Sequence, residues 1–216
     1  MGDVCVIGSS KGGVGKTSDS IALAAYLTQL GYRVACVDAD PNQALANWHR
    51  ISDQPDIDIS TETDEDAIVT HLHEKASKFD VVFCDTGGWL HQTSVFSFGA
   101  ADIVIVPVMP DRASVIEARR TARKIESVAQ IARRDIPYRV LLSRWTPRGL
   151  LERATLADLQ AAGLPCFRQH IPNLTAIAKA SFSGESPTTG PIGLALGKII
   201  DELTEIGALK AKGRAA

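Results

Sequence analysis

Short, continuous apolar runs alternate along the chain with longer stretches whose apolar residues recur every three or four positions. The apolar runs contain many β-branched residues, a composition typical of strands that are buried on both faces. They predict five strands, at residues 4–8, 33–38, 80–85, 102–108 and 138–143. Two weaker runs predict an edge strand at 56–60 and a further strand at 166–171.

Helical periodicity separates these strands and predicts helices at residues 17–30, 64–77, 112–134, 152–162 and 192–209. The first helix has an apolar stripe of leucines and is followed by Gly31, a residue that favours helix termination. The loosest segment, 183–191, is expected to be one loop. The last helix has an apolar face formed by Ile199, Ile200, Leu203 and Ile206.

Buried strands that are separated by helices require crossover connections, which join parallel strands. We therefore predict the α/β class, with a mainly parallel twisted sheet and helices on both of its faces. No linker rich in proline, glycine and serine is long enough to separate domains, and the sequence contains no internal repeat. Residues 1–216 are expected to form a single domain.

Composition narrows the possible functions without selecting one. Of the 216 residues, 45% are hydrophobic and 22% are charged, as in ordinary globular proteins. The 23 basic and 25 acidic side chains leave a net charge of -2, which excludes a basic protein that coats nucleic acid, so any DNA contact must come from a local patch. No signal peptide and no apolar segment of about 20 residues is evident, so we expect a cytoplasmic protein without a membrane partner.

A glycine-rich segment, SKGGVGKTS at 10–18, lies between the first predicted strand and the first predicted helix. Gly12, Gly13 and Gly15 allow the backbone to wrap around a phosphate group, while the helix N-terminus adds positive charge. Lys16 would reach the β- and γ-phosphates, and the Thr17 hydroxyl would ligate Mg²⁺. The simpler alternative is a glycine-rich turn that only caps a helix. The order of strand, turn and helix favours a phosphate-binding loop and a fold of the P-loop NTPase type.

Two residues of this loop depart from the ordinary pattern G-x-x-x-x-G-K-[ST]. Ser10 stands where the first glycine is expected, and Lys11 adds a second lysine just inside the loop. Two lysines so close to one phosphate chain would be redundant within a single subunit. We therefore expect Lys11 to reach a nucleotide that is bound by another copy of the chain.

The pattern KGGVGKT with its early lysine resembles the deviant Walker A motif of the ParA/MinD family of ATPases. Three further segments resemble that family in the same order: VDADPNQ at 37–43, FDVVFCDTGG at 79–88 and ADIVIVPVMPD at 101–111. Because the loop directly follows the first strand, without a preceding helix-turn-helix, the chain is similar to the small plasmid-partition ParA proteins. The resemblance covers the first half of the chain and implies a Mg²⁺-dependent ATPase that is weak without its partner.

Three aspartates follow predicted strands, at the edge where open α/β sheets bind their ligands. We expect Asp85 to hold Mg²⁺ through a water, since Mg²⁺ keeps several waters and uses few carboxylates. The resemblance implies that Asp40 positions the attacking water, and Asp38 is expected to support Thr17 and the water shell of the metal. The alternative for each is that it only caps a turn. The expected catalytic residues are Lys11, Lys16 and Asp40, and the expected metal residues are Thr17, Asp38 and Asp85.

Nucleotide contacts outside the loop are less well defined. The resemblance implies that adenine lies beside residues after the later strands, where Arg144 and Pro172 stand. Gly87 and Gly88 replace prolines that are common after the family's Walker B aspartate, which predicts a flexible loop, and Trp89 is expected to be a packed aromatic or a reporter of that loop. The expected ATP contacts are Lys11, Gly12, Gly13, Val14, Gly15, Lys16, Thr17, Ser18, Arg144 and Pro172.

The resemblance implies that hydrolysis operates a switch, with plasmid partition as the first candidate output. An ATP-bound homodimer would bind DNA nonspecifically and would therefore associate with the nucleoid. A ParB-like centromere-binding protein would then stimulate hydrolysis and release it. The expected DNA contacts are Arg119, Arg120, Arg123, Lys124 and Arg148. The alternative is that the basic residues of the helix only form a solvated face, which Glu117 and Glu126 partly neutralise.

Other outputs are open. Segments 38–48 and 85–88 also resemble the ParA-like protein of agrobacterial T-DNA transfer, which would recruit DNA to a conjugation apparatus. A MinD-like positioning ATPase would need a basic amphipathic tail, whereas residues 208–216 have almost no apolar face. A metal-cluster ATPase would need paired cysteines, and the four cysteines are far apart. A small-molecule P-loop kinase would need a lid, and none is evident.

Overall fold

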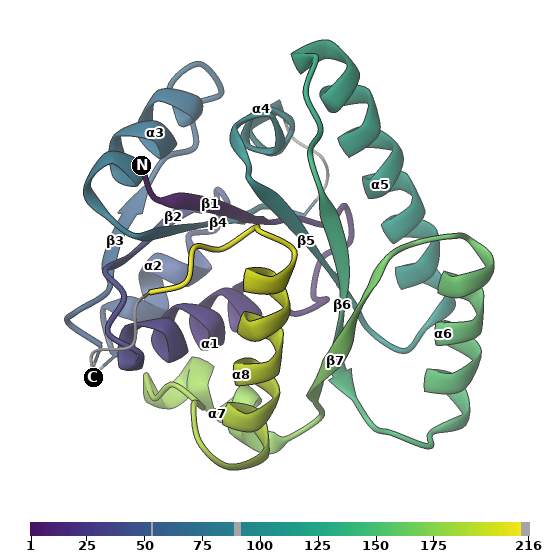
Figure 1. Ribbon diagram of the computed structural model, residues 1–216. Helices are drawn as coiled ribbons and strands as arrows, with labels where there is room; N and C mark the ends of the chain where they lie inside the picture. The colour runs from purple at the N-terminus through teal and green to yellow at the C-terminus, as the bar shows by residue number, and fades with distance from the viewer. Residues whose placement is uncertain (53, 89–91, 213–216) are drawn as a thin grey trace.

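Seven parallel strands form one sheet in the computed structural model, which describes residues 1–52, 54–88 and 92–212 (Figure 1). The strand order is β3-β2-β4-β1-β5-β6-β7, and every pairing between neighbours is parallel. All seven predicted strands are present, and the run expected at an edge, β3, is an edge strand. Their bounds are β1 Asp3–Ile7, β2 Val34–Ala39, β3 Asp58–Thr61, β4 Val81–Thr86, β5 Ile103–Val108, β6 Tyr138–Trp145 and β7 Cys166–Pro172.

Helices cover both faces of this sheet, which confirms the predicted α/β class (Figure 1). Within residues 1–52, 54–88 and 92–212, no helix has both the length and the apolar character needed to cross a bilayer. One face is covered by α1 Lys16–Gln29, α2 Ala44–His49, α7 Thr175–Ser183 and α8 Gly190–Glu205. The other is covered by α3 Ile68–Lys78, α4 Gln92–Ala100, α5 Arg112–Ala132 and α6 Leu150–Ala161.

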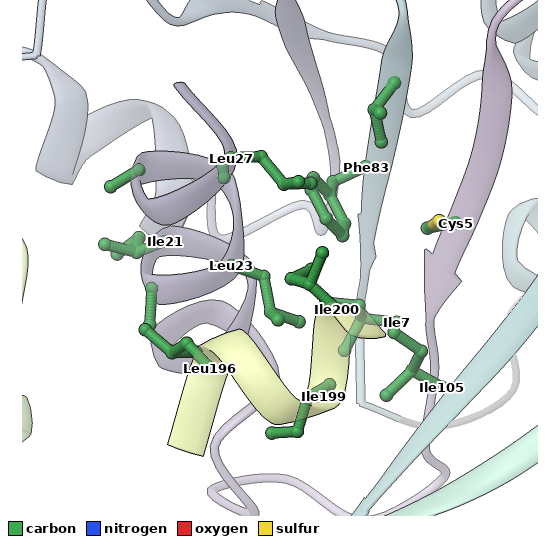
Figure 2. Packing of buried hydrophobic residues seen from close by; sticks show 14 of the residues in the cluster. Cys5, Ile7, Ile21, Leu23, Leu27, Phe83, Ile105, Leu196, Ile199 and Ile200 are labelled. Carbon is green, nitrogen blue, oxygen red and sulfur yellow. The ribbon is translucent and has the colours of Figure 1, made fainter. Parts of the chain in front are cut away.

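Alternating strand side chains divide the core into two clusters, one on each face of the sheet. Cys5 and Ile7 of β1 belong to the cluster that includes α1 and α8, whereas Val6 belongs to the cluster that includes α3 and α5. Figure 2 shows the first cluster, in which side chains of α1 and α8 meet those of the central strands. Cys36 and Cys84 are buried free thiols within these clusters.

Three short helices were not predicted from the sequence. Helix α2 has six residues and begins after Gln43, whose φ of 50° is left-handed. Helix α4 has the sequence QTSVFSFGA, which is rich in residues of weak helix propensity. Helix α7 follows β7 and packs on α1. Helices this short depend on tertiary packing more than on propensity, so periodicity along the chain does not reveal them.

The closing helix is shorter than predicted. Helix α8 ends at Glu205, and Gly207, with a φ of +73°, reverses the chain two residues later. Ile206, which we expected on the buried face, is 37% exposed because it lies after the last helical turn. The other three members of that stripe are buried, and Leu209 is buried beyond the turn. The segment expected to be one loop connects α7 to α8, whose ends extend into it.

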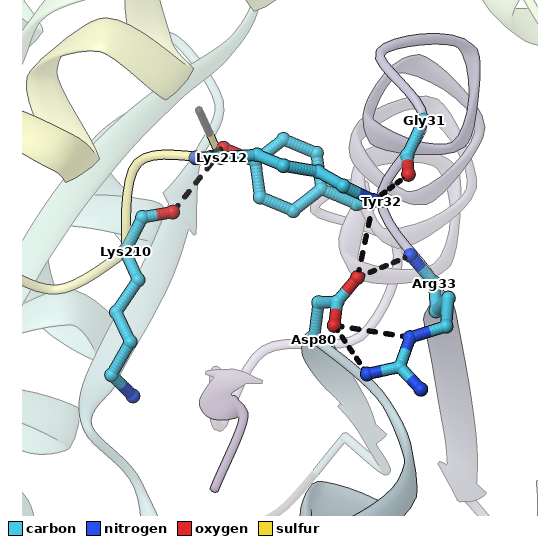
Figure 3. Close-up of polar contacts among 6 residues, drawn as sticks. All are labelled: Gly31, Tyr32, Arg33, Asp80, Lys210 and Lys212. Carbon is cyan, nitrogen blue, oxygen red and sulfur yellow. Dashed lines mark hydrogen bonds and ion pairs between the residues drawn. The ribbon is translucent and has the colours of Figure 1, made fainter. Parts of the chain in front are cut away.

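An ion-pair cluster closes the amino edge of the sheet, where the strands begin; most of its contacts are drawn in Figure 3. Arg33 donates to Asp80 through Nη2 at 2.6 Å and Nε at 3.1 Å, and its backbone N–H donates to the other carboxylate oxygen at 2.9 Å. Lys212 Nζ lies 3.3 Å from Asp80 Oδ2. Lys210 Nζ lies 2.6 Å from Asp3 Oδ1. These contacts fasten the C-terminal segment to the beginnings of β1, β2 and β4.

The carboxyl ends of β1, β2 and β4 meet at the opposite edge. The register pairs Ile7 with Asp85, and Asp38 with Asp85, so that the three strands end nearly level. Residues 8–15 leave β1 at this edge and enter α1 at Lys16. The fold therefore brings the glycine-rich loop and the strand-end aspartates to one place.

Candidate functional site

The glycine-rich loop has the conformation that its glycines allow. Gly13 and Gly15 have φ values of +75° and +105°, in the region that favours glycine. An added Cβ at Gly12 or Gly13 would meet no atom within 4 Å, so the loop borders open space there. Val14, by contrast, is buried and anchors the loop. Gly15 precedes the first residue of α1, whose N-terminal N–H groups border the same loop. This open cradle has the form that a phosphate group requires.

Lys16 is a buried cation with little compensation. Lys16 is only 7% exposed, and its Nζ donates to the carbonyl oxygen of Lys11 at 3.2 Å. Burial lowers the pKa of the Lys16 ammonium below its ordinary value, although the charges of Asp85 and Asp40 favour the protonated form. An anion bound in the loop would supply the missing compensation.

Asp85 and Thr17 form the second polar element of the site. The Thr17 hydroxyl donates to Asp85 Oδ2 at 2.6 Å. Asp85 is fully buried, and its Oδ1 has no hydrogen-bond partner within the part of the chain that the structure describes. Burial raises the pKa of the Asp85 carboxyl to about 7, although the Thr17 hydrogen bond and the Lys16 charge favour the ionised form. A hydroxyl beside an unsatisfied carboxylate oxygen is a donor set that fits Mg²⁺ and its waters.

Asp38 and Asp40 shape the turn between β2 and α2. Asp38 is fully buried and accepts the backbone N–H groups of Asp40 at 3.1 Å and Ala46 at 2.9 Å. The Thr17 hydroxyl donates to Asp85 and not to Asp38, and the expected role of Asp38 beside Thr17 and the water shell of the metal stays a prediction. Asp40 is half-buried, and its Oδ1 accepts both the backbone and side-chain N–H groups of Asn42, at 2.9 and 3.0 Å.

Lys11 is held by its own subunit. Its Nζ lies 2.7 Å from both carboxylate oxygens of Asp111 and donates to Ser114 Oγ at 3.0 Å. Asp111 is the N-cap of α5 and also accepts the backbone N–H of Ser114 at 2.8 Å. Burial would raise the pKa of the Asp111 carboxyl, but the Lys11 and Ser114 hydrogen bonds hold it below its ordinary value. Sequence reasoning missed this pairing, although Asp111 ends one of the quoted segments.

Asp19 is a second residue that sequence reasoning missed. It lies in the first turn of α1, is 2% exposed and accepts a hydrogen bond from Ser143 Oγ at 2.5 Å. Burial raises the pKa of its carboxyl to about 7, although Ser143 and the charge of Arg144 favour ionisation. An added Cβ at Gly15 would lie 3.5 Å from Asp19 Oδ2 and 3.6 Å from Ser143 Cβ, so the end of β6 packs against the loop. An acid in the first turn of an apolar helix was the available signal.

The two expected adenine contacts lie on neighbouring strand ends. Arg144 belongs to β6 and Pro172 ends β7, and the register pairs Trp145 with Pro172. Both are partly exposed, and Arg144 has a left-handed φ of 52° where the register of the two strands shifts. The structure therefore brings these two residues together at the carboxyl edge, and Arg144 directly follows Ser143, which packs against Gly15.

The loop after β4 approaches the glycine-rich loop. An added Cβ at Gly88 would lie 3.3 Å from the N and Cα atoms of Gly12. Glycine at this position therefore permits close contact between the two backbones. Trp89, the residue expected to pack or to report movement of this loop, lies outside the described residues.

The basic residues expected to contact DNA are all exposed. Arg119 and Arg123 are four residues apart on α5, as are Arg120 and Lys124, so the four side chains share one side of the helix. Arg148 lies elsewhere, in the turn between β6 and α6, with a φ of +79°. Four of the five residues expected to contact DNA therefore form one basic face of α5, and Arg148 lies apart from it.

Comparison with known proteins places this geometry in a family. Residues 5–188 match the family described as the CobQ/CobB/MinD/ParA nucleotide binding domain. The chain is 26% identical to ParA of Rhizobium radiobacter over 145 residues, which are 67% of this chain and 65% of that protein. It is 31% identical to the maintenance of carboxysome distribution protein A of Gloeobacter kilaueensis over 189 residues, 85% of this chain and 82% of that protein. It is 29% identical to virC1 of Rhizobium radiobacter over 143 residues, 63% of this chain and 62% of that protein.

Solved structures show the same fold. The ATP complex of McdA from Cyanothece matches with a TM-score of 0.81 at 17% identity and covers 98% of both chains. MinD of Pyrococcus horikoshii, complexed with Mg-ADP, matches with a TM-score of 0.78 at 16% identity, covering 99% of this chain and all of the other. The resemblance and the P-loop NTPase fold expected from the sequence are thereby confirmed. The chain belongs to the CobQ/CobB/MinD/ParA family of nucleotide-binding domains.

Proposed function

We propose that the chain is a Mg²⁺-dependent ATPase whose ATP-bound homodimer holds DNA nonspecifically and releases it when a ParB-like partner stimulates hydrolysis. The observation that carries the nucleotide part is the pair of poorly compensated charges at the carboxyl edge. Lys16 is a buried cation with a lowered pKa, and Asp85 is a buried acid with a raised pKa and an unpartnered oxygen. A triphosphate and a divalent cation would compensate both.

The chain's own residues divide the work of nucleotide binding. Lys16 would bind the β- and γ-phosphates, and the backbone of residues 12–18 would hold them in the open cradle. Thr17 and Asp85 would hold Mg²⁺, which when bound neutralises charge on the phosphates. Arg144 and Pro172 would flank the base. Fold relatives are known in complex with ATP and with Mg-ADP, which supports this choice of ligands.

Hydrolysis would require two copies of the chain. Asp40, held in its turn by Asn42, would orient the attacking water. Lys11 would leave Asp111 and exchange that carboxylate for the phosphates of the neighbouring copy, where it neutralises developing charge. A lone subunit keeps Lys11 on Asp111, so its turnover would be slow.

DNA binding is assigned to the basic face of α5. Arg119, Arg120, Arg123 and Lys124 are exposed there, and a two-fold assembly would present this face twice. Contacts with phosphates alone fit a protein whose net charge is -2, because they require only a local patch. Affinity for DNA would then fall steeply with salt.

The test is to measure molecular size with ADP and with a nonhydrolysable ATP analogue, each with and without plain duplex DNA. We expect a monomer with ADP, a dimer with the analogue, and much tighter DNA binding by the dimer than by the monomer. Lys11→Ala should bind ATP as a monomer and lose dimerisation or turnover, whereas the exposed Lys198→Ala should behave as the parent. A monomer that is indifferent to nucleotide, or a Lys11→Ala variant with full turnover, would contradict the proposal.

Recruitment of DNA to a transfer apparatus is a second candidate. It is favoured by the resemblance of segments 38–48 and 85–88 to the ParA-like protein of agrobacterial T-DNA transfer. The two candidates share the nucleotide switch and differ in DNA preference. Equal affinity for unrelated duplexes at one salt concentration would favour partition, and strong preference for one border sequence would favour transfer.

A further inference from the structure

The first two residues of the phosphate loop contact helix α5. Lys11 is held by Asp111, and its neighbour Ser10 contacts Glu117, nearly two turns further along the helix. The backbone N–H of Ser10 donates to Thr121 Oγ1 at 3.4 Å, and the Ser10 hydroxyl donates to Glu117 Oε2. Ser10 is the residue that replaces the usual first glycine of the loop, so this contact exists because the chain departs from the ordinary pattern.

Glu117 is shared between the loop and the basic face. Its Oε2 accepts from Ser10, while its Oε1 accepts from Arg120 Nη1 at 2.6 Å. The Glu117 side chain is only 20% exposed, whereas that of Arg120 is 66% exposed. A solvent-facing cation is therefore neutralised by a carboxylate whose position depends on the phosphate loop.

We propose that Glu117 couples the nucleotide site to DNA binding by controlling whether Arg120 is available to phosphates, an inference that rests on the proposed function. While Ser10 holds Glu117, the carboxylate stays beside Arg120 and competes with DNA for it. When the loop closes on a triphosphate and Lys11 leaves Asp111, the adjacent Ser10 shifts and Glu117 loses its fixed position. An ion pair without that support is an ordinary exposed pair, which competes weakly with DNA phosphates.

The same helix provides a matched control. Glu126 also belongs to α5 and carries the same charge, but it is exposed and lies more than two turns beyond Glu117, near Tyr138 rather than the phosphate loop. Replacing either glutamate by glutamine removes one negative charge from the helix. Only the change at Glu117 removes a carboxylate that contacts both Ser10 and Arg120.

The experiment measures the dissociation constant for plain duplex DNA with ADP and with a nonhydrolysable ATP analogue. We expect Ser10→Ala and Glu117→Gln to lower the ratio of the two constants by about fivefold, the lower end of typical allosteric coupling, because Arg120 is released in both states. Glu126→Gln should tighten binding equally in both states and leave the ratio unchanged. An unchanged ratio in Ser10→Ala, or an equal fall in Glu126→Gln, overturns the coupling.

A second readout separates this inference from the proposed function. If the parent chain binds no DNA in either state, the proposed function fails, and amide hydrogen exchange of residues 112–121 then decides the coupling. We expect the ATP analogue to increase exchange in this segment of the parent chain. In Ser10→Ala the exchange should already be raised without nucleotide and should change less on binding. A parent segment that does not respond to the analogue overturns the inference.

Discussion

The two edges of the sheet both gather charged side chains, but they treat them in opposite ways. At the amino edge, Arg33 and Lys212 surround Asp80 and hold the pKa of its carboxyl well below the usual range, and Asp3 raises the pKa of Lys210. At the carboxyl edge, burial raises the pKa of Asp85 to about 7 and lowers that of Lys16. The fold stabilises the charged forms of the side chains at the amino edge, whereas burial disfavours the charged forms of Asp85 and Lys16 at the carboxyl edge.

This difference distinguishes a structural cluster from a functional one. Charges that find their partners within the chain contribute to folding, whereas charges that remain uncompensated are poised for a partner from outside. Removing a charge from each edge tests this contrast. At the carboxyl edge, function should fall while stability holds or rises, and at the amino edge stability alone should fall.

The largest effect is expected for Lys16→Met. ATP turnover should fall by about 100-fold or more, because an electrostatic contact to the transferring phosphate is lost. Thermal stability without nucleotide should be unchanged or higher, since a buried cation is replaced by an apolar chain of similar length. Phosphate release and thermal unfolding measure the two effects, with the exposed Lys198→Met as the control. A variant that unfolds in the absence of nucleotide would assign Lys16 to the fold instead.

Asp85→Asn should raise stability while abolishing the dependence of nucleotide binding on Mg²⁺. The folded pKa of about 7 exceeds the ordinary 3.8, so the unfolding free energy of the parent contains a contribution that is lost as the pH rises from about 4 to 7. At pH 8 the variant should therefore be more stable by about 1 to 4 kcal/mol, and equally stable near pH 4. Denaturant unfolding at both pH values checks this, with the exposed Asp158→Asn expected to show no difference. A destabilised variant at pH 8 would contradict the assignment.

Alanine substitutions at two glycines of the loop should have different effects, one on stability and the other on ATP binding. Gly15→Ala is expected to lower the unfolding free energy by about 1 kcal/mol, since a side chain is strained at a φ of +105°. Gly12→Ala has open space for its Cβ and should leave stability unchanged while weakening ATP binding. Chemical denaturation and calorimetric titration of both variants provide the comparison. Equal destabilisation by the two changes would be the contrary result.

The smallest effect is expected at the amino edge. Asp80→Asn should lower the unfolding free energy at pH 7 by about 1 kcal/mol or less, because its partners are largely exposed. The contribution of a carboxylate with a lowered pKa is present above the ordinary 3.8 and is lost as the pH falls further, so the difference between the two proteins should shrink progressively below about pH 4. Denaturant titrations measure the difference, and ATP turnover should be unaffected. Reduced turnover would show that this edge communicates with the site.

Prediction from the sequence succeeded where the signal was local. The seven strands, the turn around Gly13 and Gly15, and the positions of Lys16 and Thr17 at the start of α1 follow from patterns within a few residues. The short helices α2, α4 and α7 were missed because packing against the sheet and α1 stabilises them. Ile206 was misassigned because Gly207, which ends the helical segment, was not recognised as a stop.

The sequence by itself determined which residues stand at the carboxyl edge, because a strand followed by glycines or aspartates is a pattern written in consecutive positions. Only the tertiary structure decided which of them meet. Hydrogen bonds join Thr17 to Asp85 over a separation of 68 positions, Lys11 to Asp111 over 100, and Asp19 to Ser143 over 124. The order β4-β1-β5-β6 sets these pairings, since hydrogen bonds form between neighbours in space and chain order does not specify which strands become neighbours.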